Sequence, residues 1–317
     1  MPKGENTLAS VIVPSWNGAH LLPACLDSLL GQSYAHLEII VADGASTDAT
    51  VDVLAGRYPR VRLVRLRRNR GFAGNVNAGV RASRGEIVCL LNNDAVADQQ
   101  WVEKSVHTLL AEPATGSVAS KILYADRKTL NSAGDQLGRD GGPRQRGAGR
   151  PDGPAWDRLE PVFGASGGAA VYRRAMLADV GLLDEVFFMY LEDVDLAFRA
   201  QLAGWGCVYQ PAARVYHQGG ATASGPLASF YNGRNLVRLL AKDLPSGVAR
   251  ELLPAMLGYQ ACRAGSALRA WRGAAARATL RGQLVGVLEL PRHLADRPPV
   301  QARRRVSDAH VLALLSQ

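Results

Sequence analysis

Short runs rich in aliphatic and β-branched residues alternate with helix-like patterns through the first 125 residues, and this alternation limits the possible folds most. The strand-like runs are Ala9–Pro14, Leu37–Ala42, Val61–Leu66, Glu86–Leu91 and Ser117–Leu123. The helical patterns between them cover about residues 20–31, 47–57, 74–83 and 99–111. Because strands that alternate with helices usually pair in parallel and are covered on both faces, we expect an α/β fold with a mostly parallel sheet flanked by helices.

Polar segments follow four of the predicted strands, at the strand ends where parallel sheets place their ligand sites. In chain order these segments are PSWNG, DGASTD, RNRGFAGNVNAG and NNDA. Neither G-x-x-x-x-G-K-[ST] nor G-x-G-x-x-G occurs, so the sequence does not indicate a P-loop protein or a dinucleotide-binding Rossmann protein. A bound diphosphate would have to be neutralised in another way, and a metal ion is the first expectation.

Two residues are candidate metal ligands. Asp94 follows an apolar strand, where a carboxylate can hold Mg²⁺ or Mn²⁺ and leave positions open for phosphate oxygens. His217 ends the strand-like run RVYH, and imidazole binds Mn²⁺ when a carboxylate shares the site. Each has a plainer alternative, since Asp94 could be a helix cap or turn residue and His217 a structural histidine. Asp43, at another strand end, could contact a nucleoside or simply form a turn.

Three carboxylates crowd the segment FMYLEDVDLAFRA, namely Glu192, Asp193 and Asp195. Neighbouring carboxylates repel one another, and apolar surroundings tend to raise their pKa. Either the segment is an acidic helix start, which the helix dipole favours, or one carboxylate is a catalytic base. We expect a helix over about 191–203, in which Asp195 and Arg199 are spaced for an ion pair. The apolar stripe that predicts this helix consists of Leu191, Val194, Phe198 and Leu202.

The rest of the chain differs in composition. Residues 134–153 hold seven glycines among Arg and Pro, which predicts a mobile loop. Beyond about residue 245 the pattern indicates helices rich in Ala, Leu and Arg. Residues 236–317 carry thirteen Arg and Lys against five Asp and Glu. Such a basic arm attracts anionic partners, such as a membrane surface or nucleic acid, although a solvated helical tail has the same composition.

Several features bear on location. Four widely spaced cysteines without a C-x-x-C pair are typical of reduced, buried thiols in a cytosolic protein; they are Cys25, Cys89, Cys207 and Cys262. The N-terminal MPKGENTLAS has no apolar core, so we expect no signal peptide. No apolar run reaches about 18 residues, so we expect no transmembrane helix. The expected location is cytoplasmic, with peripheral attachment to the inner face of the membrane as an option.

Seven segments of this chain, in order, resemble the motifs of family-2 glycosyltransferases of the GT-A fold, near the rhamnosyltransferase-like and galactofuranosyltransferase-like members. They are VIVPSWNG, VADGASTD, NRGFAGNVNAG, LLNNDA, GASGGAAVYRR, GLLDEVFFMYLEDVDLAFRAQLAGW and VYHQGG. The resemblance covers roughly residues 9–242. It implies a GT-A, Rossmann-like domain at 1–245, with a nucleotide-binding half at 1–125 and an acceptor half at 126–245. Residues 246–317 would form a helical C-terminal region.

The resemblance also implies residue roles. Asp193 matches the base of the family's ED motif, Asp94 the last residue of its metal-binding D-x-D motif, and His217 its downstream metal-ligand histidine. Arg234 and Asn235 match an RN pair that helps to bind phosphate. The other nucleotide-sugar contacts that it implies are Pro14, Trp16, Asn17, Asp43, Asn69, Gly71, Phe72, Asn75 and Asn93.

This chain departs from the family pattern at three places. The D-x-D motif reads Asn92-Asn93-Asp94, so its first carboxylate is missing. Trp16 stands where Tyr is common, which keeps an aromatic ring, and Gly44 stands where Asn is common.

These observations predict a metal-dependent, inverting hexosyltransferase that uses Mg²⁺ or Mn²⁺. The first choice of donor is dTDP-rhamnose, followed by a UDP-sugar, and the expected acceptor is a cell-envelope glycan or a lipid-linked intermediate. Asp193 would remove the proton of the acceptor hydroxyl, with Glu192 and Asp195 as supporting charges. For such an enzyme the expected partner of the basic arm is an anionic membrane surface, and no nucleic acid is expected.

The sequence leaves two alternative functions. A sugar-phosphate nucleotidyltransferase would need a Gly-rich loop with Lys or Arg after the first strand, and PSWNG lacks this. A non-catalytic nucleotide-sugar-binding protein would have no need for Asp94, Asp193 and His217 together.

Overall fold

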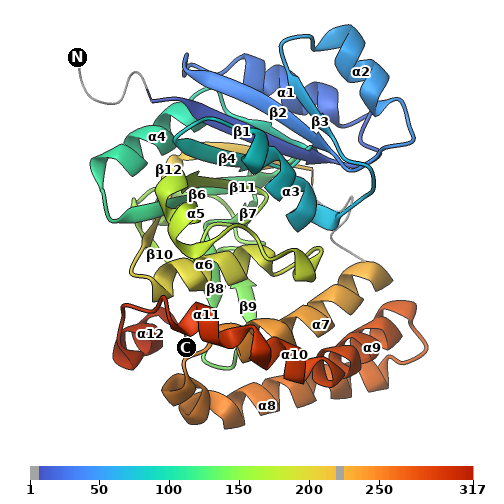
Figure 1. The fold of residues 1–317 in the computed structure, drawn as a ribbon, viewed down its shortest axis with the longest axis vertical. Helices are drawn as coiled ribbons and strands as arrows, with labels where there is room; N and C mark the ends of the chain where they lie inside the picture. Colours follow the sequence, from blue (N-terminus) through green and yellow to red (C-terminus); the bar gives the residue numbers. More distant parts are fainter. Residues whose placement is uncertain (1–6, 219–224, 317) are drawn as a thin grey trace.

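The strands and helices predicted for the first 125 residues are present close to their predicted bounds (Figure 1). The structure, a computed structural model, describes residues 7–218 and 225–316. The elements of this part are β1 (Ala9–Ser15), α1 (Leu22–Leu30), β2 (Leu37–Asp43), α2 (Thr50–Arg57), β3 (Arg62–Arg65), α3 (Gly71–Ala82), β4 (Ile87–Leu91), β5 (Ala95–Ala97), α4 (Trp101–Ala111) and β6 (Thr115–Tyr124).

The middle of the chain adds short strands and two helices, and the end of the chain is helical. The middle elements are β7 (Leu130–Ser132), β8 (Asp135–Leu137), β9 (Pro143–Gln145), the 3₁₀ helix η1 (Pro154–Trp156), β10 (Glu160–Val162), β11 (Ala169–Arg173), α5 (Arg174–Val180), the 3₁₀ helix η2 (Glu185–Phe187), α6 (Glu192–Leu202) and β12 (Gly206–His217). The helices that follow are α7 (Pro226–Asp243), α8 (Ser246–Arg269), α9 (Ala274–Leu288), α10 (Leu290–Ala295), α11 (Arg297–Gln301) and α12 (Asp308–Leu314).

One large sheet joins both halves of the chain, in the strand order β10-β12-β6-β11-β4-β1-β2-β3. Strands β4, β1, β2 and β3 run parallel, as predicted, and β12 is parallel to β6. Strand β11 lies antiparallel between β4 and β6, so β6 does not simply continue the parallel run. The α/β fold with a mostly parallel sheet is confirmed, while the insertion of β11 had no signal in the hydrophobic pattern.

Helices cover both faces of this sheet and bury two apolar layers. Helices α1, α2 and α4 pack on one face, and α3, α5 and α6 pack on the other. Helix α6 has a second apolar side: Leu196 and Ala200 face the sheet, whereas Val194 and Phe198 of the predicted stripe face α7 and α8. Helix α6 is therefore held between the sheet and the C-terminal helices, and the position of its first turn is set from both sides.

The segment predicted as a loop at 134–153 contains an antiparallel hairpin, in which β8 pairs with β9. Gly134 and Gly141 have φ angles of 100° and 75°, so they take backbone conformations that other residues rarely adopt. The glycines that suggested an irregular loop therefore form the turns of an ordered hairpin. The mobility of this segment without ligand stays a prediction.

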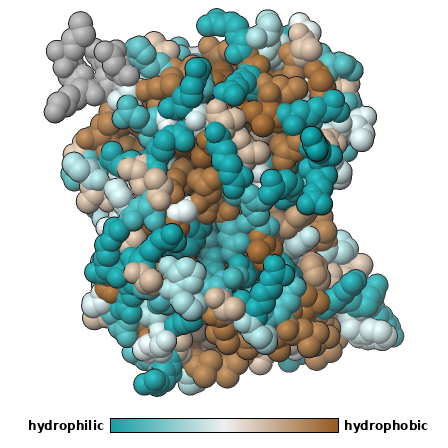
Figure 2. Space-filling view, viewed as in Figure 1, coloured by the Kyte–Doolittle hydropathy of each residue, from teal (hydrophilic) through white to brown (hydrophobic). Residues whose placement is uncertain are grey.

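The C-terminal helices form a layer below the sheet in Figure 1, and the helical character predicted beyond residue 245 is confirmed. Helix α7 already belongs to this layer and packs closely on α9, because a Cβ on Gly233 would lie 2.8 Å from the carbonyl oxygen of Thr279. Figure 2 shows apolar side chains gathered at the lower end of the molecule, over α8. Within the described ranges, no helix combines the length and apolar character needed to cross a bilayer.

The cysteines agree with the prediction in three cases of four. Cys25, Cys89 and Cys207 are buried thiols, whereas Cys262 on α8 is exposed. The expectation of buried thiols was wrong for Cys262, because α8 buries only a few of its residues.

Candidate active site

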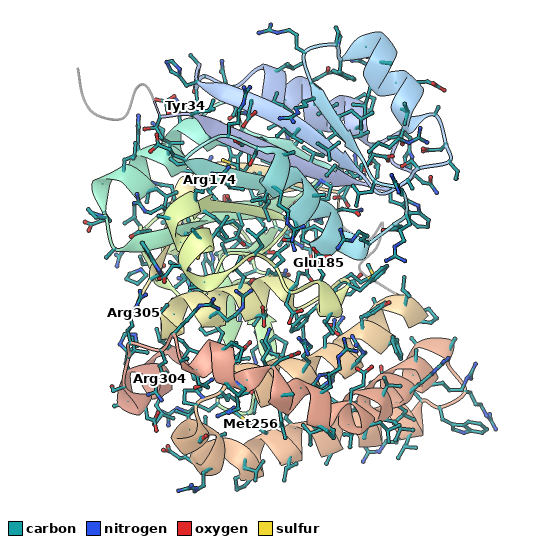
Figure 3. The ribbon with its side chains drawn as sticks, viewed as in Figure 1. Tyr34, Arg174, Glu185, Met256, Arg304 and Arg305 are labelled. Carbon is teal, nitrogen blue, oxygen red and sulfur yellow. The ribbon has the colours of Figure 1, made fainter. Side chains whose placement is uncertain are left out.

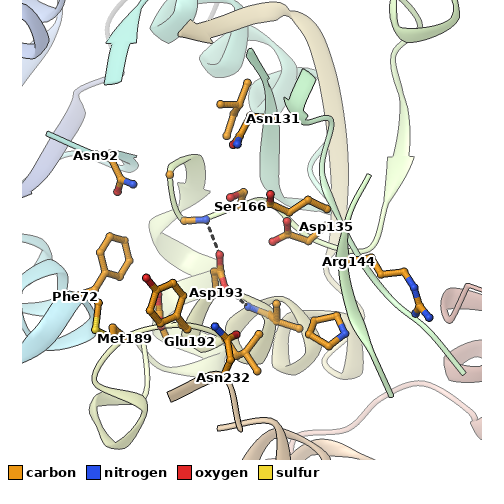
Figure 4. A pocket seen from close by; sticks show the side chains of 18 of the residues that line it. Phe72, Asn92, Asn131, Asp135, Arg144, Ser166, Met189, Glu192, Asp193 and Asn232 are labelled. Carbon is orange, nitrogen blue, oxygen red and sulfur yellow. Dashed lines mark hydrogen bonds between the residues drawn. The ribbon is translucent and has the colours of Figure 1, made fainter. Parts of the chain in front are cut away.

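A cavity of about 350 Å³ lies between the sheet and the first turn of α6 (Figure 4). Residues from separate motifs meet there: Phe72 from α3, Asn92 after β4, Asp193 from α6 and His217 at the end of β12. Such a convergence of polar groups in a concave site is the usual mark of a ligand-binding centre.

Strand pairing brings the two predicted metal ligands together. Strand β5 pairs with the end of β12 and sets Ala95 opposite His217, and the backbone N–H of Gln218 donates to the carbonyl of Asp94 over 3.0 Å. As a result, Nε2 of His217 lies 3.0 Å from Oδ1 of Asp94. The side-chain amide nitrogen of Asn92 is 3.4 Å from the same imidazole nitrogen.

The chemistry of this pair fits a divalent cation. One carboxylate oxygen and one imidazole nitrogen meet beside a polar cavity, and Mn²⁺ accepts both kinds of ligand. The described part of the chain has no group of three His, Cys, Asp or Glu residues placed to hold a metal. Asp94 and His217 would thus supply two ligands and leave the other positions for oxygens of a bound diphosphate.

Asp193 presents its carboxylate to the cavity from the first turn of α6. The backbone N–H of Gly167 donates to its Oδ2 over 2.8 Å, and that of Val194 to its Oδ1 over 2.8 Å. Burial outweighs these hydrogen bonds and, with the nearby charge of Asp195, raises the pKa of Asp193 above the usual aspartate range. The chain enters α6 through three residues in the left-handed region, Phe188, Tyr190 and Leu191, and backbone strain of this kind concentrates at functional sites.

The other two carboxylates of the acidic segment have different surroundings. Asp195 is fully buried, and its Oδ2 lies 2.8 Å from Nη2 of Arg199, which confirms the predicted ion pair. Lys242 of α7 also pairs with Asp195, a partner that the sequence did not indicate. Burial opposes ionisation of Asp195, but Arg199 and Lys242 outweigh it and hold its pKa well below the usual range. Burial and the charge of Asp193 raise the pKa of Glu192 well above the usual range.

The RN pair supports the loop before α6. The side-chain amide of Asn235 donates to the carbonyls of Phe187, Met189 and Tyr190 over 2.9, 2.9 and 2.8 Å. Asn235 therefore fixes the strained turn that precedes Asp193.

Arg234 makes contacts that differ from the predicted one. It donates to the carbonyl of Val186 over 2.8 Å, and its Nε lies 2.8 Å from Glu289. These contacts use Nε and Nη1 of the guanidinium, and the predicted phosphate contact of Arg234 stays a prediction.

Glu185 ties the same loop to α3 and to the residue just before it. Figure 3 shows Glu185 reaching from η2 toward α3. Its Oε1 accepts a hydrogen bond from Asn77 over 3.1 Å and lies 3.3 Å from Nη1 of Arg81, and its Oε2 pairs with Arg70. The Asp193 loop and α3, which carries Phe72, are thus held together.

The loops after β1 and β2 bind each other. Asn17 donates from its backbone to Oγ of Ser46 over 2.8 Å, and its side-chain oxygen accepts from the N–H of Thr47 over 2.9 Å. The carboxylate of Asp43 is buried and accepts from the N–H of Ser46 over 3.1 Å. Trp16 is 55 % exposed beside this joined pair of loops, so its ring is available to a planar ligand.

Gly44, one of the departures from the family pattern, has a steric reason. A Cβ at this position would lie 2.5 Å from Nδ2 of Asn75 and 3.3 Å from Oδ1 of Asn69. Gly71 is restricted in the same way, since it has a φ of 71° and its missing Cβ faces the carbonyl of Phe188. These contacts place the loop after β2 against the asparagines that precede and open α3.

The predicted donor contacts divide into two groups. Phe72 lines the cavity. Apart from Arg234 on α7, the remaining ones lie at the ends of β1, β2 and β4 or around the start of α3. Pro14 is buried within β1, and Asn93 donates to Oγ of Ser15 over 3.2 Å. Together they form a continuous edge that runs from Trp16 to the Asp94–His217 pair.

Comparisons with known proteins bear on the family to which the chain belongs. The model of the family "Glycosyl transferase family 2" matches residues 10–181. The N-acetylglucosaminyl-diphospho-decaprenol L-rhamnosyltransferase of Mycobacterium tuberculosis is 32 % identical over 267 residues, which cover 76 % of this chain and 86 % of that protein. The uncharacterized protein y4gI of Sinorhizobium fredii is 30 % identical over 233 residues; the match covers 70 % of this chain but only 25 % of that longer protein.

A solved structure shows the same fold. The mannosyltransferase PcManGT of Pyrobaculum calidifontis has a TM-score of 0.56 and 20 % identity, with 94 % of this chain and 86 % of that chain covered. The chain therefore belongs to glycosyl transferase family 2 and has the GT-A fold that its motifs predicted.

Proposed function

We propose that this protein is a metal-dependent, inverting glycosyltransferase that moves a sugar from a nucleoside diphosphate to a lipid-linked or cell-envelope glycan. The observation that carries the proposal is the position of Asp193 and His217 on one cavity, with Asp94 3.0 Å from the imidazole. A base and a metal-ligand pair on opposite sides of one reacting centre are what transfer from a nucleotide sugar requires.

Asp193 is the proposed base. It accepts the proton of an acceptor hydroxyl while that oxygen bonds to the anomeric carbon and the bond to the diphosphate breaks. One such displacement inverts the anomeric configuration. The raised pKa of Asp193 makes its carboxylate a stronger base than an ordinary aspartate, which favours proton transfer at neutral pH.

Asp94 and His217 are the proposed ligands of Mg²⁺ or Mn²⁺, which when bound neutralises charge on the departing diphosphate. The solved PcManGT is a complex with GDP-Man and Mn²⁺, which supports a divalent ion in this fold. The nucleotide would lie along the edge at the ends of β1, β2 and β4. The residues proposed to bind it are Pro14, Trp16, Asn17, Asp43, Asn69, Gly71, Phe72, Asn75 and Asn93.

Rhamnose is the first candidate for the transferred sugar, with galactofuranose or an N-acetylhexosamine from UDP behind it. The support is the Mycobacterium tuberculosis relative, whose name describes transfer of L-rhamnose to N-acetylglucosaminyl-diphospho-decaprenol. The same name supports an acceptor that is a sugar on a lipid diphosphate.

We also propose that the outer surface of α8–α10 rests on an anionic membrane at the cytoplasmic side. Large apolar side chains are exposed there beside exposed arginines, a combination that suits the membrane interface. The apolar side chains are Leu253, Leu257, Leu268, Trp271, Leu284, Val287, Leu288 and Leu294. The arginines are Arg250, Arg269, Arg272, Arg277, Arg281 and Arg292.

Release of nucleoside diphosphate tests the proposal. The purified protein is incubated with dTDP-rhamnose, UDP-galactofuranose or UDP-N-acetylglucosamine, with Mn²⁺ or EDTA, and with or without a polyprenyl-diphospho-N-acetylglucosamine acceptor. We expect release that requires both metal and acceptor. Formation of nucleoside triphosphate from the nucleotide sugar and added pyrophosphate would instead indicate a nucleotidyltransferase, and donor binding without turnover would indicate a binding protein.

A further inference from the structure

Asp135, at the start of β8, is a buried carboxylate of the cavity that the reaction described above does not use. It is 3 % exposed and lines the cavity together with Glu192 and Asp193. Its backbone N–H donates to the carbonyl of Gly164 over 2.8 Å, which fixes the residue in place. Figure 4 shows its side chain beside Ser166 and close to Asp193.

One carboxylate oxygen of Asp135 lacks a hydrogen-bond partner in the part of the chain that the structure describes. Among the described residues, none donates a hydrogen bond to its buried Oδ2. A buried polar group without a partner costs free energy, and such groups in native structures call for a reason. In strand β8 the side chains of Asp135 and Leu137 are both buried, so an apolar residue would suit this position if packing were its only purpose.

The charge state of Asp135 suits it to a neutral ligand. Burial, and next the charge of Asp193, raise the pKa of Asp135 well above the usual range, which favours the neutral carboxyl group. A neutral carboxyl group has one O–H donor and free acceptor positions. It can bind a sugar hydroxyl without adding a second negative charge beside the base.

The position of Asp135 points to the acceptor rather than the donor. The predicted donor contacts other than Arg234 follow β1, β2 and β4 or lie around the start of α3, whereas Asp135 belongs to the β8–β9 hairpin. The same hairpin adds Arg144 and Gln145 to the lining of the cavity, and α7 adds Asn232. This side of the cavity is therefore polar, and it is built by elements other than those that carry Asp94 and His217.

We propose that Asp135 binds a hydroxyl of the acceptor sugar next to the one that Asp193 deprotonates, and thereby determines which hydroxyl is attacked. The ligand class is a pyranose with two neighbouring hydroxyls. The inference rests on the proposed function, because it needs Asp193 to act on a sugar hydroxyl.

Two substitutions and a matched control test this role. Asp135→Leu keeps the size but removes all hydrogen bonding, Asp135→Asn keeps part of it, and Gln136→Ala alters the neighbouring residue that does not line the cavity. Turnover is measured with a short-chain polyprenyl-diphospho-N-acetylglucosamine as acceptor. Slow hydrolysis of the donor without acceptor serves as the second readout.

We expect Asp135→Leu to raise the acceptor KM about 10-fold or more, because a buried hydrogen bond is lost. Asp135→Asn should raise it by a smaller factor, and Gln136→Ala should leave it unchanged. Donor KM should stay near its wild-type value in all three variants, and in the two Asp135 variants donor hydrolysis should fall by a smaller factor than turnover with acceptor. With wild-type protein, an acceptor analogue that lacks the neighbouring hydroxyl should have a KM that is raised by a similar factor. With Asp135→Leu or Asp135→Asn, removal of this hydroxyl should raise the acceptor KM little further.

An unchanged acceptor KM in Asp135→Leu, or an equal loss of donor hydrolysis and acceptor use, would overturn the inference. If Asp135→Leu does not fold, Asp135→Asn is tested with the deoxy analogue instead. If the substitution and the missing hydroxyl raise the acceptor KM by independent factors, Asp135 does not contact that hydroxyl and the inference is overturned. Failure of the proposed function looks different, because wild-type protein would then release no nucleoside diphosphate with any acceptor.

Discussion

The backbone N–H of Gly167 donates to Oδ2 of Asp193 over 2.8 Å, so the loop before β11 sets the direction of the carboxylate that α6 presents. Glu192 and Asp195 have no such contact with this loop among the described residues. The three carboxylates of the acidic segment are therefore not equivalent, and only Asp193 is held by the cavity wall.

If Asp193 is the base, Asp193→Asn should lower turnover about 10²–10⁴-fold and leave nucleotide-sugar affinity nearly unchanged, because Asn keeps the size but cannot take a proton. Turnover and calorimetric binding of the donor check both parts. Glu192→Gln should have a milder effect. Near-native turnover in Asp193→Asn would mean that the segment is only an acidic helix start.

The pH dependence of kcat/KM of the wild-type protein should report the ionisation of Asp193. A base must be ionised to act, so kcat/KM should rise with pH as Asp193 loses its proton. Because burial raises the pKa of Asp193, this rise should lie above the usual aspartate range. The rise should be absent from the residual activity of Asp193→Asn.

Asp94→Asn and His217→Ala should weaken nucleotide binding in Mn²⁺ and have little effect in EDTA, because each removes a ligand of the proposed ion. Calorimetric titration with UDP and dTDP, with and without Mn²⁺, measures this. His107→Ala, an exposed histidine on α4, is the matched control. Equal loss of binding with and without Mn²⁺ would show that the pair does not hold a metal.

Lys242→Met should cost about 3–5 kcal/mol of unfolding free energy, because it leaves the buried carboxylate of Asp195 without one of its cations. Lys242 is 4 % exposed and also lies 2.8 Å from Asp184. The control is Arg57→Met, which breaks the exposed Arg57–Asp27 pair and should cost less than about 1 kcal/mol. Urea unfolding of both variants makes the comparison, and similar losses would contradict it.

His293 should make the protein less stable as the pH falls from about 6.5 toward 4. Burial, and next the positive charge of Arg238, lower its pKa to about 4, below the ordinary value of about 6.5 in the unfolded chain. The neutral imidazole is thus favoured in the fold, and its contribution is complete above pH 6.5 and lost on acidification. Nearby Glu289 and Asp296 oppose this effect only in part.

Thermal unfolding from pH 7 to 4.5 tests this expectation. Wild-type protein should lose more stability over this range than His293→Gln, which cannot take up a proton. Parallel curves for the two proteins would show that His293 titrates normally.

The surface of α8–α10 should bind vesicles that contain phosphatidylglycerol, and added salt should weaken the binding. Leu268→Ser with Trp271→Ser should reduce recovery in flotation, while Leu159→Ser, which alters a 58 % exposed leucine elsewhere, should not. Equal recovery with neutral vesicles, or none at low salt, would contradict the proposal. Concentration-dependent dimers that the double substitution abolishes would instead assign this surface to a second copy of the chain.

Much of the first half of the fold could be predicted, because its strands and helices each have a clear hydrophobic period. The strand order could not, since the place of β11 depends on pairing between distant segments. For the same reason, the pairing of β5 with β12 that joins Asp94 to His217 had no local signal. Asp94 and His217 could be assigned to one site from the resemblance to a family, and not from the hydrophobic period of the strands and helices.

The contacts of buried polar side chains were the hardest part to predict. Asn235 was expected at a phosphate but holds the carbonyls before α6, and Lys242 had no predicted role. Asp135 was not predicted as a site residue, because it lies in a Gly-rich segment that was expected to be a loop. The available sequence signal was the position of Asp135 between Gly134 and the apolar Leu137. Whether Asp135 is buried, however, depends on the hairpin and on α6.

The antiparallel strand β11 has a consequence for synthesis on the ribosome. Strands β4 and β6 cannot join until β11 pairs between them, so the sheet stays divided until residue 173 has left the exit tunnel. Until then both halves expose unpaired strand edges, which invite association with other chains. A fragment that stops after β6 would keep these edges permanently, and the strands of the first 125 residues therefore depend on later sequence to become a finished sheet.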